Sequence, residues 1–192
     1  VEEAPTAYTD VMTVRESGRR TFFHNRGANA LLSPGDYPLD ELSCRILTLG
    51  YLLLLDGMDE DDPEYGTRAA RVLAGCRERG ILTAVDVVSE DSDRFARIVT
   101  PALAHVDYLV INEIEAARTT GTELRGGETL DRGALERAAE LLLENGVKQA
   151  VVIHTPEAAF GLTVSSEATW MAAHTLPDGF IRGSAGAGDA FF

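Results

Sequence analysis

The feature of this sequence that most constrains its fold is an alternation of apolar, β-prone segments with helical segments. The apolar segments are near-continuous runs, which is typical of strands buried on both faces. Strands are expected at residues 44–49, 81–88, 106–111 and 147–153. Helices are expected at residues 63–79, 93–103 and 131–145. This order predicts an α/β fold with a mostly parallel sheet flanked by helices.

Local signals mark the ends of two of these helices. Segment 131–145 carries apolar residues at helical spacing along one face, and Gly146 follows it as a stop. Segment 63–79 has Pro63 near its start and Gly80 just past its end. Both segments therefore read as helices that begin and end within the stated residues.

The two ends of the chain have a different character from the middle. Residues 7–14 and 20–24 are β-rich and are separated by a Glu-Ser-Gly turn, which predicts a β-hairpin. Residues 160–181 suit short strands in antiparallel connection. We therefore expect a hairpin with its connecting loop at residues 1–36 and an α/β core at residues 37–192.

The charge balance restricts the partners of the chain. Its net charge of −14 opposes binding to nucleic acid and to anionic membranes, so neither is an expected partner. ATP remains compatible, because a phosphate needs only a small cradle of backbone N–H groups. The acidic run at residues 59–62 predicts a solvated turn before a helix. The apolar run 51–55 is far too short to span a bilayer.

The cysteines and the chain ends bear on location and completeness. Cys44 and Cys76 lie far apart with no metal-ligand spacing, which suits reduced thiols in the cytoplasm. No charged-then-apolar leader opens the chain at Val1. The chain stops at Phe192, directly after a glycine motif that ought to open a helix. We therefore expect a cytoplasmic protein and a segment of a longer polypeptide.

The sharpest local motif is Gly186-Ala187-Gly188-Asp189. Three small residues let the backbone approach a ligand closely, and at a helix start their N–H groups form an anion hole. A carboxylate directly after such a hole makes sense if it takes a proton from a hydroxyl that attacks a phosphate. A dinucleotide-binding reading fails because Phe191 holds the third glycine position, and no Walker Lys-Ser/Thr follows. A plain flexible turn remains an open alternative.

A second motif, Asn112-Glu113-Ile114-Glu115, directly follows the predicted strand 106–111. Ligands of parallel α/β sheets bind at the carboxyl ends of the strands. Asn112 and Glu115 could therefore hold a hydrated magnesium ion or its phosphates. The alternative is a capping box, in which the same two side chains only terminate a helix.

Taken together, the two motifs resemble the paired signature of the ribokinase-like (PfkB) carbohydrate kinases. Segment 20–29, which includes a Gly-Ala-Asn sequence, resembles the return strand of that family's lid and the loop behind it. The resemblance covers essentially the whole chain. It implies an ATP-dependent phosphorylation of a small carbohydrate hydroxyl, with ATP and Mg²⁺ as cofactors. It also implies that the hairpin is a lid over the sugar and can pair two subunits into a homodimer.

The resemblance also implies roles for individual residues. Asp189 would be the catalytic base, and the N–H groups of Gly186, Ala187 and Gly188 would stabilise the transferring phosphoryl group. Asn112 and Glu115 would act near Mg²⁺ and the phosphates through water, with no protein side chain binding the metal directly. Asn29 would face the sugar.

Three departures from the family pattern are visible. Gly183 stands where the family has an Asp of its monovalent-cation site, which speaks against activation by such a cation. His154-Thr155-Pro156 replaces the family's Thr-x-Gly near the nucleotide, and Val88 stands two residues after Asp86 in place of an Asn. These changes motivate an alternative function, a non-catalytic sugar- or nucleotide-binding relative with the same fold.

Overall fold

The computed structural model describes residues 4–15, 20–177, 179–180 and 186–192 of the chain. Gly183 and the central turn of the N-terminal hairpin lie outside the described residues. None of the helices in the described part combines the length and the apolar character needed to cross a bilayer.

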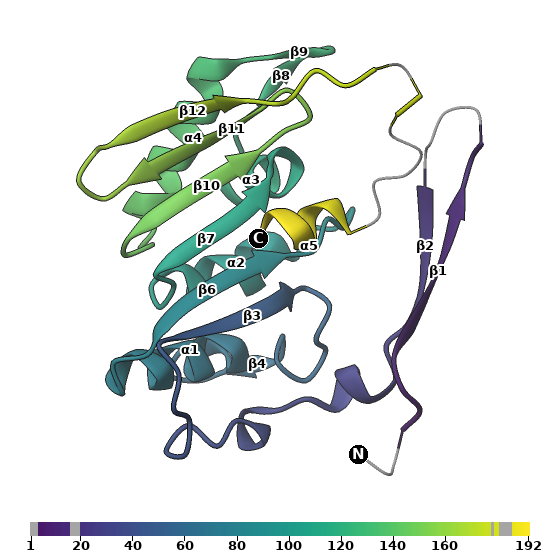
Figure 1. Cartoon of the computed structure of the whole chain (residues 1–192). Helices are drawn as coiled ribbons and strands as arrows, with labels where there is room; N and C mark the ends of the chain where they lie inside the picture. Colours follow the sequence, from purple (N-terminus) through teal and green to yellow (C-terminus); the bar gives the residue numbers. More distant parts are fainter. Residues whose placement is uncertain (1–3, 16–19, 178, 181–185) are drawn as a thin grey trace.

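The centre of the fold is a six-stranded sheet with the order β12-β11-β10-β7-β6-β3 (Figure 1). The four parallel strands are β3 (Ile46–Leu52), β6 (Leu82–Val87), β7 (Tyr108–Asn112) and β10 (Ala150–His154). Two antiparallel strands, β11 (Ala158–Thr163) and β12 (Ala168–Ala172), extend one edge. The predicted mostly parallel α/β sheet is confirmed.

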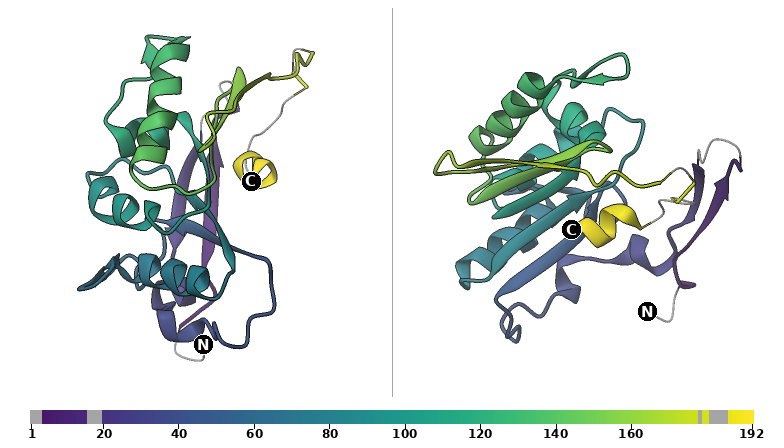
Figure 2. Two further views of the ribbon diagram at one scale, coloured as in Figure 1. Left: turned by 90° about the vertical axis from the view of Figure 1, so that its left-hand side faces the viewer. Right: turned by 45° about the horizontal axis from the view of Figure 1, so that its top comes forward.

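Four helices cover one face of this sheet, whereas the short α5 (Ala187–Phe191) lies on the other face (Figure 2). The four are α1 (Arg68–Glu78), α2 (Phe95–Leu103), α3 (Glu113–Thr120) and α4 (Arg132–Glu144). Along β7 and β10, buried residues such as Leu109 and Ile153 alternate with half-buried ones. The buried set forms the core, since burial of these side chains against the helices removes apolar surface from water.

The predicted helix at residues 63–79 is wrong in its first five residues. The Asp62 carboxylate accepts hydrogen bonds from the backbone N–H groups of Glu64 (3.0 Å) and Tyr65 (2.9 Å), which closes a turn. That turn joins β4 (Asp61–Asp62) to β5 (Gly66–Thr67). The helix begins only at Arg68, after Thr67 accepts a capping bond from the N–H of Ala70.

The predicted solvated turn at residues 59–62 is also wrong in part. Asp59 and Asp62 are buried, with only 4% and 8% of their surface exposed. Each is buried because it satisfies backbone N–H groups of a neighbouring turn, Leu53 for Asp59 and Glu64 and Tyr65 for Asp62. Only Glu60 and Asp61 are exposed as expected.

The N-terminal hairpin is present, formed by β1 (Tyr8–Thr13) and β2 (Arg20–Asn25) in antiparallel register. It stands beside the sheet, and nearly all of its side chains are exposed (Figure 1). Two 3₁₀ turns, η1 (Gly27–Leu31) and η2 (Pro34–Asp36), lead from it towards β3. A second small hairpin, β8 (Arg125–Gly126) with β9 (Thr129–Leu130), links α3 to α4.

Candidate active site

Three polar side chains, those of Asp86, Asn112 and His154, lie at or near the carboxyl ends of neighbouring parallel strands. His154 is the register partner of Asn112 across the β7–β10 ladder, and Asp86 follows directly after the β6 residue that pairs with β7. All three occupy the half-buried positions of their strands, which point away from the helix-covered face. Ligands of open parallel sheets bind at this edge, so it is the natural place for a site.

Asn112 and Glu115 form a complete capping box at the start of α3. The Asn112 side-chain oxygen accepts from the N–H groups of Ile114 (2.9 Å) and Glu115 (3.0 Å). In return, the Glu115 carboxylate accepts from the N–H of Asn112 at 2.9 Å and from its amide Nδ2 at 2.7 Å. The capping interpretation is therefore confirmed as geometry, and it leaves the box at the ligand-binding edge of the sheet.

Ser89 completes this box from the preceding strand–helix connection. Its hydroxyl donates to the Glu115 carboxylate at 2.7 Å and accepts from the Asn112 amide at 2.8 Å. The three side chains thus form a closed triangle of hydrogen bonds. Sequence reasoning did not select Ser89, because no local pattern connects it with a helix that starts 24 residues later in the chain.

Two carboxyl groups at this edge have pKa values raised towards neutral pH. Glu115 has only 4% of its surface exposed, and burial raises its pKa to about 7 against the opposing hydrogen bonds from Asn112 and Ser89. Burial likewise raises the pKa of Asp86 to about 6, and the charge of Asp86 adds to the rise at Glu115. Asp86 was not among the predicted site residues; a lone Asp inside an apolar strand is the signal that could have found it.

The glycine motif reaches the same edge through α5. Gly186 caps the helix in the left-handed region (φ 75°), and Asp189 lies in the first turn. A Cβ placed on Gly186 would lie 3.6 Å from Oδ2 of Asp189, so this carboxylate turns back over the start of the helix. The Phe191 ring packs on the His154 ring at a centroid distance of 4.8 Å. This contact brings Asp189 and its helix beside the end of β10.

His154 therefore supports α5, at a position where the family pattern has a different residue. Burial lowers the pKa of the imidazole, which favours its neutral form. Thr155 turns the chain after β10, since its hydroxyl accepts from the N–H groups of Glu157 (3.1 Å) and Ala158 (3.0 Å). The remodelled His154-Thr155-Pro156 segment is thus a platform for the helix and a tight turn into β11.

Asn29 is the one predicted site residue that lies elsewhere. It is exposed in η1 at the foot of the hairpin. Within the described residues, no hydrogen bond joins its side chain to Asn112, Glu115 or Asp189. In the same part of the chain, no group of three or more His, Cys, Asp or Glu side chains is arranged to hold a metal ion.

Comparison with solved structures shows which fold this is. Ribokinase from Giardia lamblia superposes with a TM-score of 0.74 at 18% identity, over 100% of this chain and 55% of that one. Arabidopsis thaliana ribokinase complexed with ribose and ATP gives 0.67 at 21% identity, over 98% and 55%. Adenosine kinase from Schistosoma mansoni in complex with 2-fluoroadenosine gives 0.72 at 15% identity, over 100% and 55%.

The chain therefore spans about half the length of these solved relatives. A comparison with curated proteins gave no match. The sequence matches the family described as pfkB family carbohydrate kinase over residues 1–192. A ribokinase-like sheet, a family match along its entire length and two motifs that meet at one edge lead to one conclusion: the chain belongs to the pfkB carbohydrate kinase family.

Proposed function

We propose that this chain is part of an ATP-dependent kinase that phosphorylates a hydroxyl group of a small carbohydrate. The observation that carries the proposal is the convergence of α5 and the Asn112–Glu115 box on one edge of the sheet, through the contact between Phe191 and His154. Family membership and the ribokinase fold support the same reaction class.

In this proposal, Asp189 is the catalytic base. It accepts the proton of the acceptor hydroxyl while that oxygen attacks the γ-phosphorus of ATP and the bond to ADP breaks. The N–H groups of Gly186, Ala187 and Gly188 stabilise the negative charge of the transferring phosphoryl group. Most of the rate enhancement then comes from positioning and charge stabilisation, as phosphoryl transfer requires.

The acidic edge fits a magnesium ion held through water. Magnesium favours oxygen ligands and keeps several of its waters, and when bound it neutralises phosphate charge. Glu115 already accepts bonds from Asn112 and Ser89, so it would contact only metal-bound water. Asp86 accepts a bond from the N–H of Val87, and its half-buried carboxylate has acceptor capacity left for a second water.

The test is the Asp189→Asn variant of the full-length protein, assayed against a panel of sugars and nucleosides. Loss of a general base is expected to lower turnover by about a thousandfold, with ATP affinity retained in calorimetry. Asp40→Asn is the matched control, because this exposed carboxylate pairs with Arg79 at the end of α1. A loss of only a few-fold in Asp189→Asn would remove this residue from the role of base.

A non-catalytic binding relative is the second candidate, favoured by the fully engaged Glu115 carboxylate and the replaced His154 segment. Thermal shift distinguishes the two functions, since a ligand that binds only the folded state raises the melting temperature. Stabilisation by sugars with none from Mg-nucleotides would support the binding function. Stabilisation by both classes supports the kinase.

The hairpin is proposed as a lid that pairs with a second copy of the chain. Its exposed apolar side chains include Met12 (62%), Phe23 (56%) and Phe22 (46%). A lone two-stranded hairpin is marginal in water, so a partner surface would stabilise it. Light scattering of the full-length protein is expected to show a dimer that Phe23→Ser weakens; a monomer at assay concentration contradicts this proposal.

A further inference from the structure

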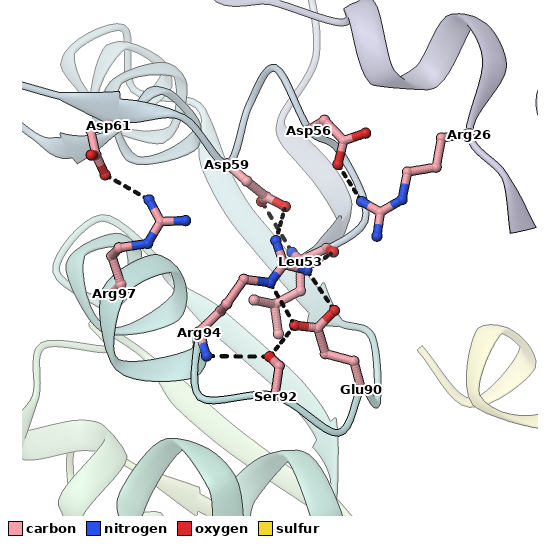
Figure 3. Close-up of polar contacts among 9 residues, drawn as sticks. All are labelled: Arg26, Leu53, Asp56, Asp59, Asp61, Glu90, Ser92, Arg94 and Arg97. Carbon is pink, nitrogen blue, oxygen red and sulfur yellow. Dashed lines mark hydrogen bonds and ion pairs between the residues drawn. The ribbon is translucent and has the colours of Figure 1, made fainter.

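A cluster of polar contacts around Arg94 joins two segments that are distant in sequence (Figure 3). We call it the Arg94 clamp and define it as Arg94, Glu90, Ser92, Asp59 and Leu53. It lies between the connection after β6, which carries Ser89, and the turn 53–59 after β3. None of its members touches the proposed reacting groups directly, so its role must be argued from what it holds in place.

Arg94 binds both segments at once. Its guanidinium donates to Glu90 through Nε at 2.9 Å and through Nη2 at 2.5 Å, and it donates to the backbone oxygen of Leu53 at 2.9 Å. The N–H of Arg94 donates to Ser92 Oγ, which itself bonds to Glu90. A planar guanidinium presents several donors in a fixed fork, so these contacts define the position of the 89–94 connection relative to the turn.

The turn that receives Arg94 is held by contacts of its own. Leu53 is fully buried and has a left-handed backbone (φ 77°), which is unfavourable for a side chain of this size. The buried Asp59 carboxylate supports this conformation by accepting from the N–H of Leu53 at 3.1 Å. Its second oxygen, Oδ2, has no hydrogen-bond partner in the described residues and lies 3.9 Å from Nη1 of Arg94. Arg94 thus places a cation next to the one oxygen of this buried carboxylate that accepts no hydrogen bond in the described residues.

The same turn is fastened to the foot of the hairpin. Arg26, just after β2, forms an ion pair with Asp56, and the N–H of Gly57 donates to the backbone oxygen of Ala30 at 3.0 Å. A Cβ on Gly57 would lie 2.4 Å from the oxygen of Leu32, so the two backbones are in close contact. The foot of the hairpin and the 53–59 turn are therefore joined by an ion pair, a backbone hydrogen bond and a close backbone contact.

The other end of the clamped connection is Ser89, which closes the hydrogen-bond triangle with Asn112 and Glu115. We propose that Arg94 is a positioning residue whose clamp sets the place of Ser89, and thereby of the Asn112–Glu115 box, relative to the foot of the hairpin. The proposal rests on the kinase function for its catalytic consequence, though not for its structural one. It makes the hairpin and the phosphate end of the site parts of one mechanical unit.

The first test measures amide hydrogen exchange and does not depend on activity. In Arg94→Gln, residues 88–93 and the capped amides of residues 112–115 are expected to exchange at least about tenfold faster, because lost packing constraints lower the local opening free energy. Arg97→Gln is the matched control. Arg97 lies one turn further along, and its guanidinium bonds only to the exposed Asp61 among the described residues. The proposal would be overturned if exchange became faster at residues 88–93 and stayed at the wild-type rate at residues 112–115.

Two further variants keep this test decisive if Arg94→Gln folds poorly. Ser89→Ala leaves the clamp intact and is expected to accelerate exchange at residues 112–115 alone. Arg94→Lys keeps the charge without the fork, so an intermediate rate is expected. Unchanged exchange of the box in Ser89→Ala would show that Ser89 is not the link and would also overturn the proposal.

The second test is kinetic and uses the full-length protein with Mg-ATP. Arg94→Gln is expected to lower kcat at least about tenfold with little change in the KM of the sugar, since misplaced positioning groups cost rate. Arg97→Gln should match the wild type. A wild type inactive on every substrate would refute the kinase function while the exchange result still decides the clamp. A normal kcat in Arg94→Gln would refute the positioning role of Arg94 and leave the proposed kinase function untouched.

Discussion

The two motifs that meet at the carboxyl edge are built in opposite ways. In the Asn112–Glu115 box, Glu115 is buried, the two side chains cap the helix start reciprocally, and Ser89 closes the hydrogen bonds. Arg125 adds ion pairs that tie Glu113 at the start of α3 to Glu157 after β10. Gly186 and Asp189, by contrast, belong to a five-residue helix with no buried residue, which rests on His154 through Phe191. Because helices this short are not stable alone, α5 takes its position from tertiary contact.

The difference indicates that the two motifs serve the site in different ways. In the proposed function, the preformed box would hold phosphates and water at a fixed place, whereas the lightly held helix would close on the substrate and bring the proposed base Asp189 with it. The following changes test this contrast, from the largest expected effect to the smallest.

Glu115→Ala should break the rigid region. The change leaves the N–H and amide of Asn112 and the hydroxyl of Ser89 without their buried acceptor, which costs roughly 2–5 kcal/mol of unfolding free energy. Chemical denaturation measures this loss. The exposed Glu128→Ala, in the turn between β8 and β9, is the control and should change stability little. A similarly small effect of Glu115→Ala would show that the box contributes little to the free energy of unfolding.

The pH dependence of stability should report the same buried group. The folded pKa of Glu115 is raised to about 7 from 4.5, so the folded state holds a proton that the unfolded state has released. Its contribution is complete below pH 4.5 and is lost as the pH rises through about 7, which amounts to roughly 3 kcal/mol. Denaturation curves between pH 5 and 8 measure it. Glu115→Gln should flatten this dependence; an unchanged slope would assign the effect to Asp86 or another group.

His154→Ala should release α5 without disturbing the box. Loss of the ring contact with Phe191 is worth about 1 kcal/mol. Amide exchange is therefore expected to rise in residues 186–192 and stay unchanged at residues 112–115. His154→Phe keeps an aromatic ring and should preserve α5. If exchange rises equally in both segments, the two motifs form one cooperative unit and the contrast is wrong.

Gly186→Ala should have the smallest effect on stability. The left-handed backbone at this position (φ 75°) disfavours a Cβ by roughly 1 kcal/mol. The expected result is a weaker start of α5, measured as faster exchange of the Ala190 amide, which bonds to the Gly186 oxygen at 3.0 Å. Gly188→Ala is the control, since a Cβ there would meet no atom of the described residues within 4 Å.

Sequence patterns predicted the sheet well and the helix boundaries less well. Strands such as β7 and β10 are marked by near-continuous apolar runs, although only the face turned towards the helices is fully buried and the other is half-buried. The start of α1 was misplaced because the Asp62 carboxylate closes a turn over residues that have ordinary helical propensity. A short-range side-chain bond therefore outweighed the pattern.

What the sequence determined by itself is local: the order of strands and helices, the Asn112–Glu115 capping box and the glycine motif before Asp189. These follow from apolar periodicity and from side chains three residues apart, which interact whatever the rest of the chain does. Only the tertiary structure decided that Ser89 closes the box from 26 positions away, that His154 supports α5 and that Arg94 clamps the turn below the hairpin. Such contacts depend on which strand ends become neighbours in the sheet, and strand order is a property of the folded chain.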